Sequence, residues 1–180
     1  MKIILVGVVA LMMAGPVIAE DRVVVEIAGD DTCTTAAGEK GFDALTWQVG
    51  GSNAVNIGAT GTGTGAGKPK LQDLVLTRNQ DACSEKLIKD FVSGTILPSV
   101  TLTQYRTMNA EGQLFAAVTV TLTNSILASY SISGATGIRP SENLDFAYTK
   151  VCVTTIAQGP SGALLAPQKV CYNAATNTVN

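Results

Sequence analysis

Hydrophobic and polar positions alternate along most of the chain after residue 20, which is typical of strands with one buried face. The clearest case is residues 116–123, in which Val118, Val120 and Leu122 alternate with threonines. Several other runs are rich in β-branched residues and end at glycine, aspartate or asparagine. We therefore expect strands over residues 23–27, 42–49, 71–77, 99–104, 116–123, 126–132, 144–156 and 170–172.

The alternation in residues 42–49 also predicts which side chains face inward. Leu45, Trp47 and Val49 share one parity and form the more hydrophobic side, whereas Phe42 and Ala44 share the other. Because a half-buried strand turns its more hydrophobic side toward the core, we expect the first three residues to be buried.

One segment, at about residues 82–93, has the spacing of a helix instead. Its apolar positions recur at helical intervals, and Asp81 or Ser84 can cap its start. Gly94 follows as a C-terminal stop, with Pro98 just beyond it. The apolar stripe is typical of core packing and consists of Leu87, Ile88, Phe91 and Val92.

These elements predict a single mainly β domain of eight to ten strands with one mid-chain helix, arranged as a barrel or a sandwich.

The composition of the chain excludes several classes of function. The chain has no histidine, which excludes imidazole-based triads, histidine general bases and histidine metal ligands. Its net charge is -2, so it lacks the basic surface that nucleic-acid binding needs. Only 14% of the residues are charged, which suggests a surface that is partly hidden in an assembly or that tolerates an extracellular setting.

The first 19 residues have the pattern of a secretory signal peptide. Lys2 precedes an apolar run over residues 3–14, and Val17 and Ala19 stand at the small-residue positions before a cleavage site. We expect cleavage after Ala19, which leaves residues 20–180 as the mature domain, secreted or periplasmic in a bacterium. A retained membrane anchor is the alternative, but the apolar run is marginal for spanning a bilayer.

Export changes the interpretation of the four cysteines, because an even number in an oxidising compartment favours disulfides. A two-residue hairpin turn at Ser161 and Gly162 would place Cys152 opposite Cys171, within disulfide range. The remaining pair is Cys33 and Cys83. Four buried thiols are the alternative, and the cysteine spacing does not support a zinc site.

Residues 58–68 are rich in glycine and suggest a phosphate-binding loop, but the pattern does not fit one. Thr62 stands where that loop needs a glycine, and Pro69 follows Lys68. No helix start is predicted there to hold a phosphate. The segment is better explained as a long loop between strands that acts as a contact arm.

No catalytic constellation is visible elsewhere. Ser161 lacks the spacing of a nucleophile elbow, and the aspartates show no calcium-loop spacing. The sequence therefore predicts no catalytic residue, no cofactor and no metal site.

The order of these features resembles the haemolysin-coregulated protein (Hcp) family, the tube protein of bacterial type VI secretion. The resemblance extends over about residues 22–175. It rests on residues 42–47, 65–68, 71–78, the helix that ends at residues 93–94, and residues 100–102 and 141–146.

This resemblance implies a small β-barrel of two sheets with one helix on its side. It also implies hexameric rings that stack into a hollow tube with room for protein cargo. The loop that bridges stacked rings would lie within residues 50–70, with contact residues Gly58, Gly61, Gly63, Gly65, Gly67 and Lys68.

The signal peptide and the disulfides depart from the family pattern, because type VI tube subunits assemble inside the cell without a leader. Our hypothesis is an exported, non-catalytic relative that assembles into rings or tubes and is cross-linked by disulfides. Two alternatives stay open: a tube or effector-carrier protein of the usual machine, and a monomeric secreted binding module. A secreted enzyme is the least favoured class.

Overall fold

The computed structural model describes residues 21–56, 65–109 and 112–180, so the expected signal peptide, residues 1–19, lies outside the described residues. The fold is mainly β with one mid-chain helix, as the sequence predicts. In chain order the elements are β1 (Arg22–Ile27), β2 (Phe42–Ala44), β3 (Thr46–Gln48), β4 (Gly51–Ser52), β5 (Val55–Asn56), β6 (Gly65–Ala66), β7 (Lys70–Leu71), β8 (Leu74–Asn79), α1 (Ser84–Ser93), β9 (Ile96–Thr107), β10 (Leu114–Ser133), β11 (Ser141–Thr155), β12 (Gln168–Asn173) and β13 (Thr178–Val179).

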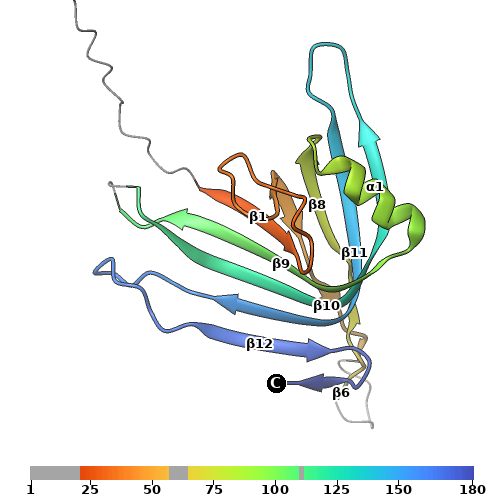
Figure 1. The fold of residues 1–180 in the computed structure, drawn as a ribbon. Helices are drawn as coiled ribbons and strands as arrows, with labels where there is room; N and C mark the ends of the chain where they lie inside the picture. Colours follow the sequence, from red (N-terminus) through yellow and green to blue (C-terminus); the bar gives the residue numbers. More distant parts are fainter. Residues whose placement is uncertain (1–20, 57–64, 110–111) are drawn as a thin grey trace, which may run out of the picture.

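Two layers share the long strands β10 and β11 (Figure 1). The first half of β11 pairs with β8, and its second half pairs with β12. The larger layer follows the order β2-β1-β9-β10-β11-β12-β13, and β3 extends the smaller layer beyond β8. All of these pairs are antiparallel, so short turns and hairpins connect most of them.

The sequence predicted two strands, residues 116–123 and 126–132, where the structure has the single strand β10. Asn124 lies between the two predicted segments and has a left-handed backbone with φ of 48°. Asparagine tolerates this conformation, so the strand continues through it instead of ending. The two predicted segments are therefore one strand, β10, which takes part in both layers.

The expected strand over residues 42–49 is two strands, and its predicted inward face was wrong for Leu45. Phe42 and Ala44 are buried in β2, which pairs with β1, whereas Leu45 is 58% exposed. After Leu45 the chain passes to the smaller layer, where β3 pairs with β8. The prediction assumed that one alternation runs through the whole segment. It fails at Leu45 because the segment changes partner strand at that residue. Trp47 and Val49 are half-buried and contact the core.

The two layers do not close into a barrel among the described strands. The ladder is open, and its end strands β2 and β13 do not pair with each other. On that side, the layers are joined by the covalent connection from β2 to β3 and not by a continuous row of paired strands. The expected two-sheet arrangement is therefore present, with an open ladder.

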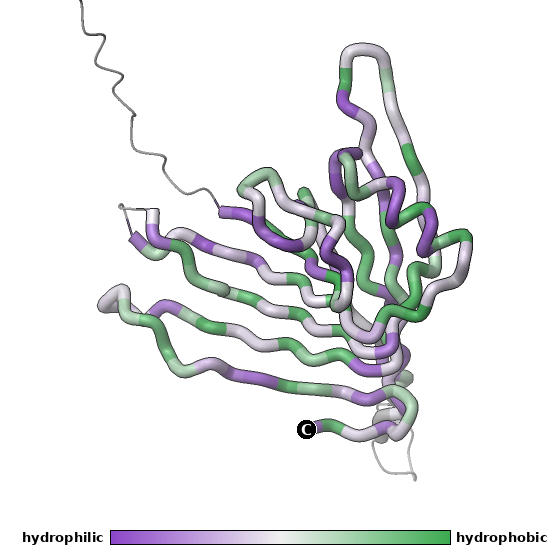
Figure 2. Tube along the Cα trace, viewed as in Figure 1, coloured by the Kyte–Doolittle hydropathy of each residue, from purple (hydrophilic) through white to green (hydrophobic). Residues whose placement is uncertain are grey.

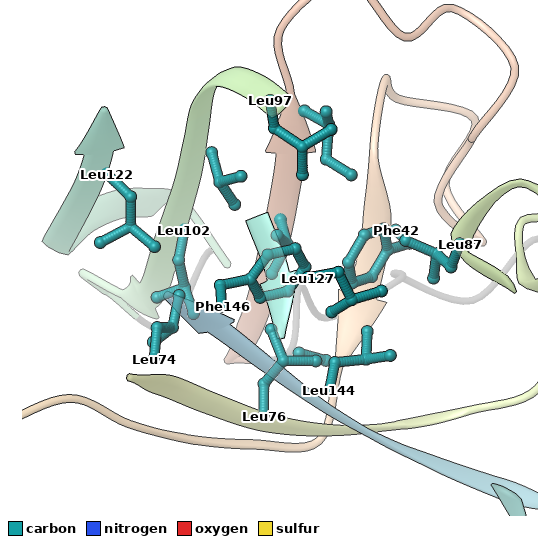
Figure 3. Packing of buried hydrophobic residues seen from close by; sticks show 14 of the residues in the cluster. Phe42, Leu74, Leu76, Leu87, Leu97, Leu102, Leu122, Leu127, Leu144 and Phe146 are labelled. Atoms are coloured by element: carbon teal, nitrogen blue, oxygen red, sulfur yellow. The ribbon is translucent and has the colours of Figure 1, made fainter. Parts of the chain in front are cut away.

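The core lies between the layers (Figure 3). Leu102 and Leu122 come from the larger layer, while Leu74 and Phe146 come from the smaller one. All four are fully buried. The predicted alternation in β10 is confirmed at Val120 and Leu122, and Figure 2 shows hydrophobic and polar positions alternating along the strands.

The predicted helix is α1, and its end at Gly94 is confirmed by that residue's left-handed backbone (φ 61°). Leu87 is buried and Phe91 stacks on Tyr130, with ring centroids 6.0 Å apart. The inward position predicted for Val92 was wrong, because Asp90 occupies the buried side and Val92 is exposed. The predicted cap by Asp81 or Ser84 was wrong, because Cys83 is the N-cap residue and no side chain in the described part of the chain caps it. Asp81 instead accepts a hydrogen bond from the Cys83 amide (2.8 Å) before the helix starts.

Candidate functional site

The inner face of the larger layer continues beyond the core without a covering layer. Directly paired residues share a face, and one such row joins Val120, Val153 and Val170. Val120 is fully buried, whereas Val170 is 60% exposed. A parallel row leads from Val151 through Tyr172 to the exposed Val179. We call the outer part of this surface the open face; its residues are Val153, Val170, Tyr172 and Val179.

The predicted Cys152–Cys171 disulfide lies on the opposite side of the same strands. Cys152 and Cys171 are direct partners in the β11–β12 ladder and are joined by a disulfide, as the hairpin argument predicted. Alternation along a strand turns neighbouring side chains to opposite faces, so the disulfide backs the open face. It holds β12 to β11 where little of β12 is buried in the core.

The turn of this hairpin is one residue earlier than predicted. The amide of Gly162 donates to the Gly159 carbonyl, so Pro160 and Ser161 form the centre of the turn instead of Ser161 and Gly162. Proline suits the second position of such a turn because its φ is restricted. Unpaired residues between the turn and the strands absorb the difference, and the predicted Cys152–Cys171 register is kept.

The glycine-rich segment forms a narrow antiparallel ribbon where it is described. We call residues 50–72 the arm. In it β4 pairs with β7, and β5 pairs with β6. Of the predicted contact residues, Gly65 lies in β6 and Gly67 donates its amide to the Ala54 carbonyl (2.7 Å). Gly58, Gly61 and Gly63 lie outside the described residues.

A close backbone approach explains a glycine at the base of the arm. A Cβ atom at Gly51 would lie 2.8 Å from the Lys70 carbonyl oxygen, a contact that real Cβ atoms do not make. Any other residue there would push β4 and β7 apart. The base of the arm therefore requires glycine at this position.

Within the part of the arm that the structure describes, two hydrogen bonds join it to the body of the protein. Lys68 Nζ donates to the Ala174 carbonyl in the turn between β12 and β13 (2.9 Å). The Tyr148 hydroxyl donates to the Gln72 carbonyl at the base of the arm (2.8 Å). Burial and the nearby Asp73 carboxylate raise the pKa of Tyr148 to about 12, so its hydroxyl stays a donor at neutral pH. The arm and the turn that follows the open face therefore lie side by side.

The second disulfide joins Cys33 to Cys83, the predicted pair. It connects the loop after β1 to the start of α1, and both cysteines are buried. Asp30 lies beside it. Burial raises the pKa of Asp30, but hydrogen bonds from Thr32 and the Lys86 charge outweigh that effect and lower it. This corner is held by a covalent bond and by charge.

The arm, the open face and the fold can be compared with known proteins. A protein-family model described as "Type VI secretion system effector, Hcp" matches residues 18–154. The chain belongs to the Hcp family. The match includes the arm and ends before the β12–β13 hairpin that carries most of the open face.

Solved structures agree on the fold. A structure described as that of a type six secretion system protein is 25% identical, with a TM-score of 0.78, and the match covers 89% of this chain and 99% of that one. Hcp1 from Salmonella typhimurium is 19% identical with a TM-score of 0.69, over 89% and 99% of the two chains. Hcp2 from the same organism is 18% identical with a TM-score of 0.59, over 87% and 98%. No curated protein matches the sequence.

The hydrogen bonds that hold the arm of this Hcp protein against its body could not be derived from the sequence. Lys68 and Ala174 are 106 residues apart, and the acceptor is a backbone carbonyl that has no sequence signal. The sequence indicated the open face only in part, because it predicted a strand over residues 170–172 but not the exposure of that strand. Their exposure depends on which layers exist beside them.

The described part of the chain contains no group of three or more cysteine, aspartate or glutamate side chains arranged to hold a metal ion. A cavity of about 380 Å³ lies near the Cys33–Cys83 disulfide and is lined by Asp43, Asp81, Arg139 and threonines. None of the helices described is long and apolar enough to cross a membrane.

Proposed function

We propose that this Hcp protein is a non-catalytic structural subunit that assembles into hexameric rings, and that these rings stack into a hollow tube outside the cytoplasm. The open face would join neighbours within a ring, and the arm would contact the next ring. The lumen would be available to protein cargo. Family membership and the similarity to type VI secretion proteins support a tube role of this kind.

The observation that carries the proposal is the continuation of core side chains onto the open face. Val153 and Tyr172 contact the edge of the core, while Val170 and Val179 are 60% and 68% exposed. Burying exposed apolar surface is worth roughly 25 cal/mol per Å², and contiguous apolar patches of this kind mark protein interfaces. A second copy of the chain would supply the missing cover.

The edge of the larger layer supports lateral assembly as well. β13 is short and pairs only with residues 172 and 173 of β12, so the described residues 168–170 lie at the edge of the sheet. Edge strands have backbone groups that are available to another strand. A neighbouring subunit could therefore pair with β12 at the point where Val170 is exposed.

The arm suits contact between rings because it extends from the layers as a narrow ribbon (Figure 1). We assign the ring-stacking contact to Gly65, Gly67 and Lys68 together with Gly58, Gly61 and Gly63. Small side chains would let the ribbon approach another subunit closely. This assignment follows the family resemblance.

Export is supported by the two disulfides, because such bonds form and persist in oxidising compartments. The signal peptide over residues 1–19, with cleavage after Ala19, would deliver the chain to the periplasm or beyond. Assembly would then follow export and disulfide formation.

A second candidate function is a tube or effector-carrier protein of the usual type VI machine, which the family description favours. The two proposals differ in cellular location before assembly. Mass spectrometry of the N-terminus from a periplasmic fraction would separate them. A chain that begins at Glu20 supports export, whereas an intact N-terminus in the cytoplasm supports the usual machine.

The assembly is tested by light scattering and electron microscopy of residues 20–180, purified from the periplasm without reductant. We expect six-subunit rings, with stacks at high protein concentration. Val170→Lys places a charge on the open face and should shift the protein to monomers without unfolding it. Val75→Lys is the matched control, since Val75 is also an exposed strand valine but lies on the smaller layer.

A wild-type protein that stays monomeric at high concentration would contradict the proposal and favour a monomeric binding module. Rings that persist unchanged in Val170→Lys would show that the open face is not the interface.

A further inference from the structure

Among the described residues of the arm, Lys68 and Gln72 form hydrogen bonds to the body, and both bonds lead to the same place on β11. At its base, the Gln72 amide donates to the Gly50 carbonyl (2.9 Å), which closes the ribbon. The Gln72 carbonyl accepts the hydrogen bond from Tyr148. The backbone of one residue, Gln72, thus joins the two arm strands to each other and to β11.

The second contact reaches β11 through the C-terminal turn. Ala174, which accepts from Lys68, donates its own amide to the Thr149 carbonyl (2.9 Å). Thr149 is the residue after Tyr148, and its hydroxyl donates to the Thr123 carbonyl on β10 (3.1 Å). Both arm contacts therefore end at neighbouring residues of β11, beside the left-handed Asn124 of β10.

The Cys152–Cys171 disulfide holds the turn that receives Lys68. Asn173, the residue before Ala174, pairs with Lys150, two residues from the disulfide in each strand. Because β12 and β13 bury little against the core, the ladder and this bond are their main attachments to β11. We call the β12–β13 turn together with Tyr148 and Thr149 the arm seat.

We propose that Tyr148 and Lys68 are positioning residues that hold the arm on this seat, and that the Cys152–Cys171 disulfide keeps the seat in place for contact with a second copy of the chain. The role in ring contact rests on the proposed function. The seating itself does not, because all of its contacts lie within one chain. Loss of either hydrogen bond would let the ribbon move about its base.

The seating is tested by amide hydrogen exchange of the arm in the mature protein at a concentration below that of assembly. In Tyr148→Phe and Lys68→Gln we expect two- to tenfold faster exchange of the amides in residues 50–56 and 65–72. Lys70→Gln is the matched control, since Lys70 is an exposed lysine of the same ribbon for which the structure describes no hydrogen bond from the side chain. It should leave the exchange unchanged.

The disulfide is tested in the same way with two double variants. Cys152→Ser with Cys171→Ser should speed arm exchange by a similar factor. Cys33→Ser with Cys83→Ser, which removes the other bond, should leave the arm unchanged. Faster arm exchange in both would mean general loosening and would overturn the link between this disulfide and the arm.

Electron microscopy of the same variants then tests the role in stacking. We expect Tyr148→Phe and Lys68→Gln to form rings but shorter stacks. Unchanged arm exchange in both variants would overturn the seating. Faster exchange with normal stacks would overturn its role in ring contact. If the wild type forms no rings, the proposed function fails, while the exchange measurement still decides whether the arm is seated by these residues.

Discussion

Arg78 and Glu142 face each other across the β8–β11 ladder, and both side chains are completely buried. Arg78 Nε lies 3.5 Å from Glu142 Oε2, and the guanidinium lies over the Phe42 ring, 4.5 Å from its centroid. The Tyr130 hydroxyl donates to Glu142 Oε1 (2.7 Å). Arg78 also forms an ion pair with Asp81 at the start of α1. This buried pair connects the smaller layer to the helix.

Glu142→Gln should destabilise the protein by about 3 kcal/mol, because it leaves the Arg78 charge buried with only Asp81 as an opposite charge. Urea unfolding measures the loss. Replacing both residues, with Arg78→Met and Glu142→Leu, should cost less than the sum of the single changes, because no buried charge is then left unpaired. Additive losses would contradict a coupled pair.

Gly41→Ala should cost several times more stability than Gly38→Ala. Both glycines have positive φ, but a Cβ at Gly41 would lie 2.3 Å from the Val25 carbonyl oxygen, whereas nothing lies within 4 Å at Gly38. The left-handed backbone alone costs about 1–2 kcal/mol, which is the loss expected at Gly38. Thermal unfolding of the two variants makes the comparison, and equal losses would show that β1 moves freely away from Gly41.

Removing the Cys33–Cys83 disulfide should cost about 4 kcal/mol and removing Cys152–Cys171 about 3 kcal/mol, because the first closes the longer loop in the unfolded chain. Paired serine variants of each bond, unfolded in urea, give the two values. The reverse order would mean that strain or residual structure outweighs chain entropy.

Stability should fall as the pH rises from about 10 to 12. The pKa of Tyr148 is raised to about 12 in the folded protein, so the unfolded chain loses that proton first and unfolding becomes easier above pH 10. Burial and the bond to Glu142 also raise the pKa of Tyr130. Tyr148→Phe should make this fall in the free energy of unfolding smaller by about 1 kcal/mol, a figure that allows for solvent screening of the half-exposed Tyr148 ring.

Urea unfolding at pH 9 and pH 11 measures this difference. An equal fall in the wild type and in Tyr148→Phe would contradict the assignment.

Local patterns in the sequence were sufficient for several features. The period-two alternation placed Val120 and Leu122 in the core, and Gly94 ended the helix where expected. The turn signal near Ser161 gave the pairing of Cys152 with Cys171, because a hairpin places strand residues opposite each other about its turn, and unpaired residues beside the turn made up the one-residue difference in its position. These features depend on residues that are near in sequence or opposite in one hairpin.

The tertiary structure alone decided features that depend on which elements become neighbours. The inward side of residues 42–49 changed because Leu45 stands where the chain passes from one layer to the other. Arg78 and Glu142 occupy positions in step with buried leucines, but their pairing arises only once β8 lies beside β11. The seating of Lys68 on Ala174 likewise requires two distant segments to meet at a backbone carbonyl. Sequence by itself determined the mainly β character, the helix and the Cys152–Cys171 pair through local periodicity and turns, and Cys33–Cys83 followed as the remaining pair. The exposure of the open face and the position of the arm were decided by long-range packing, because burial and hydrogen-bond partners are properties of the assembled layers.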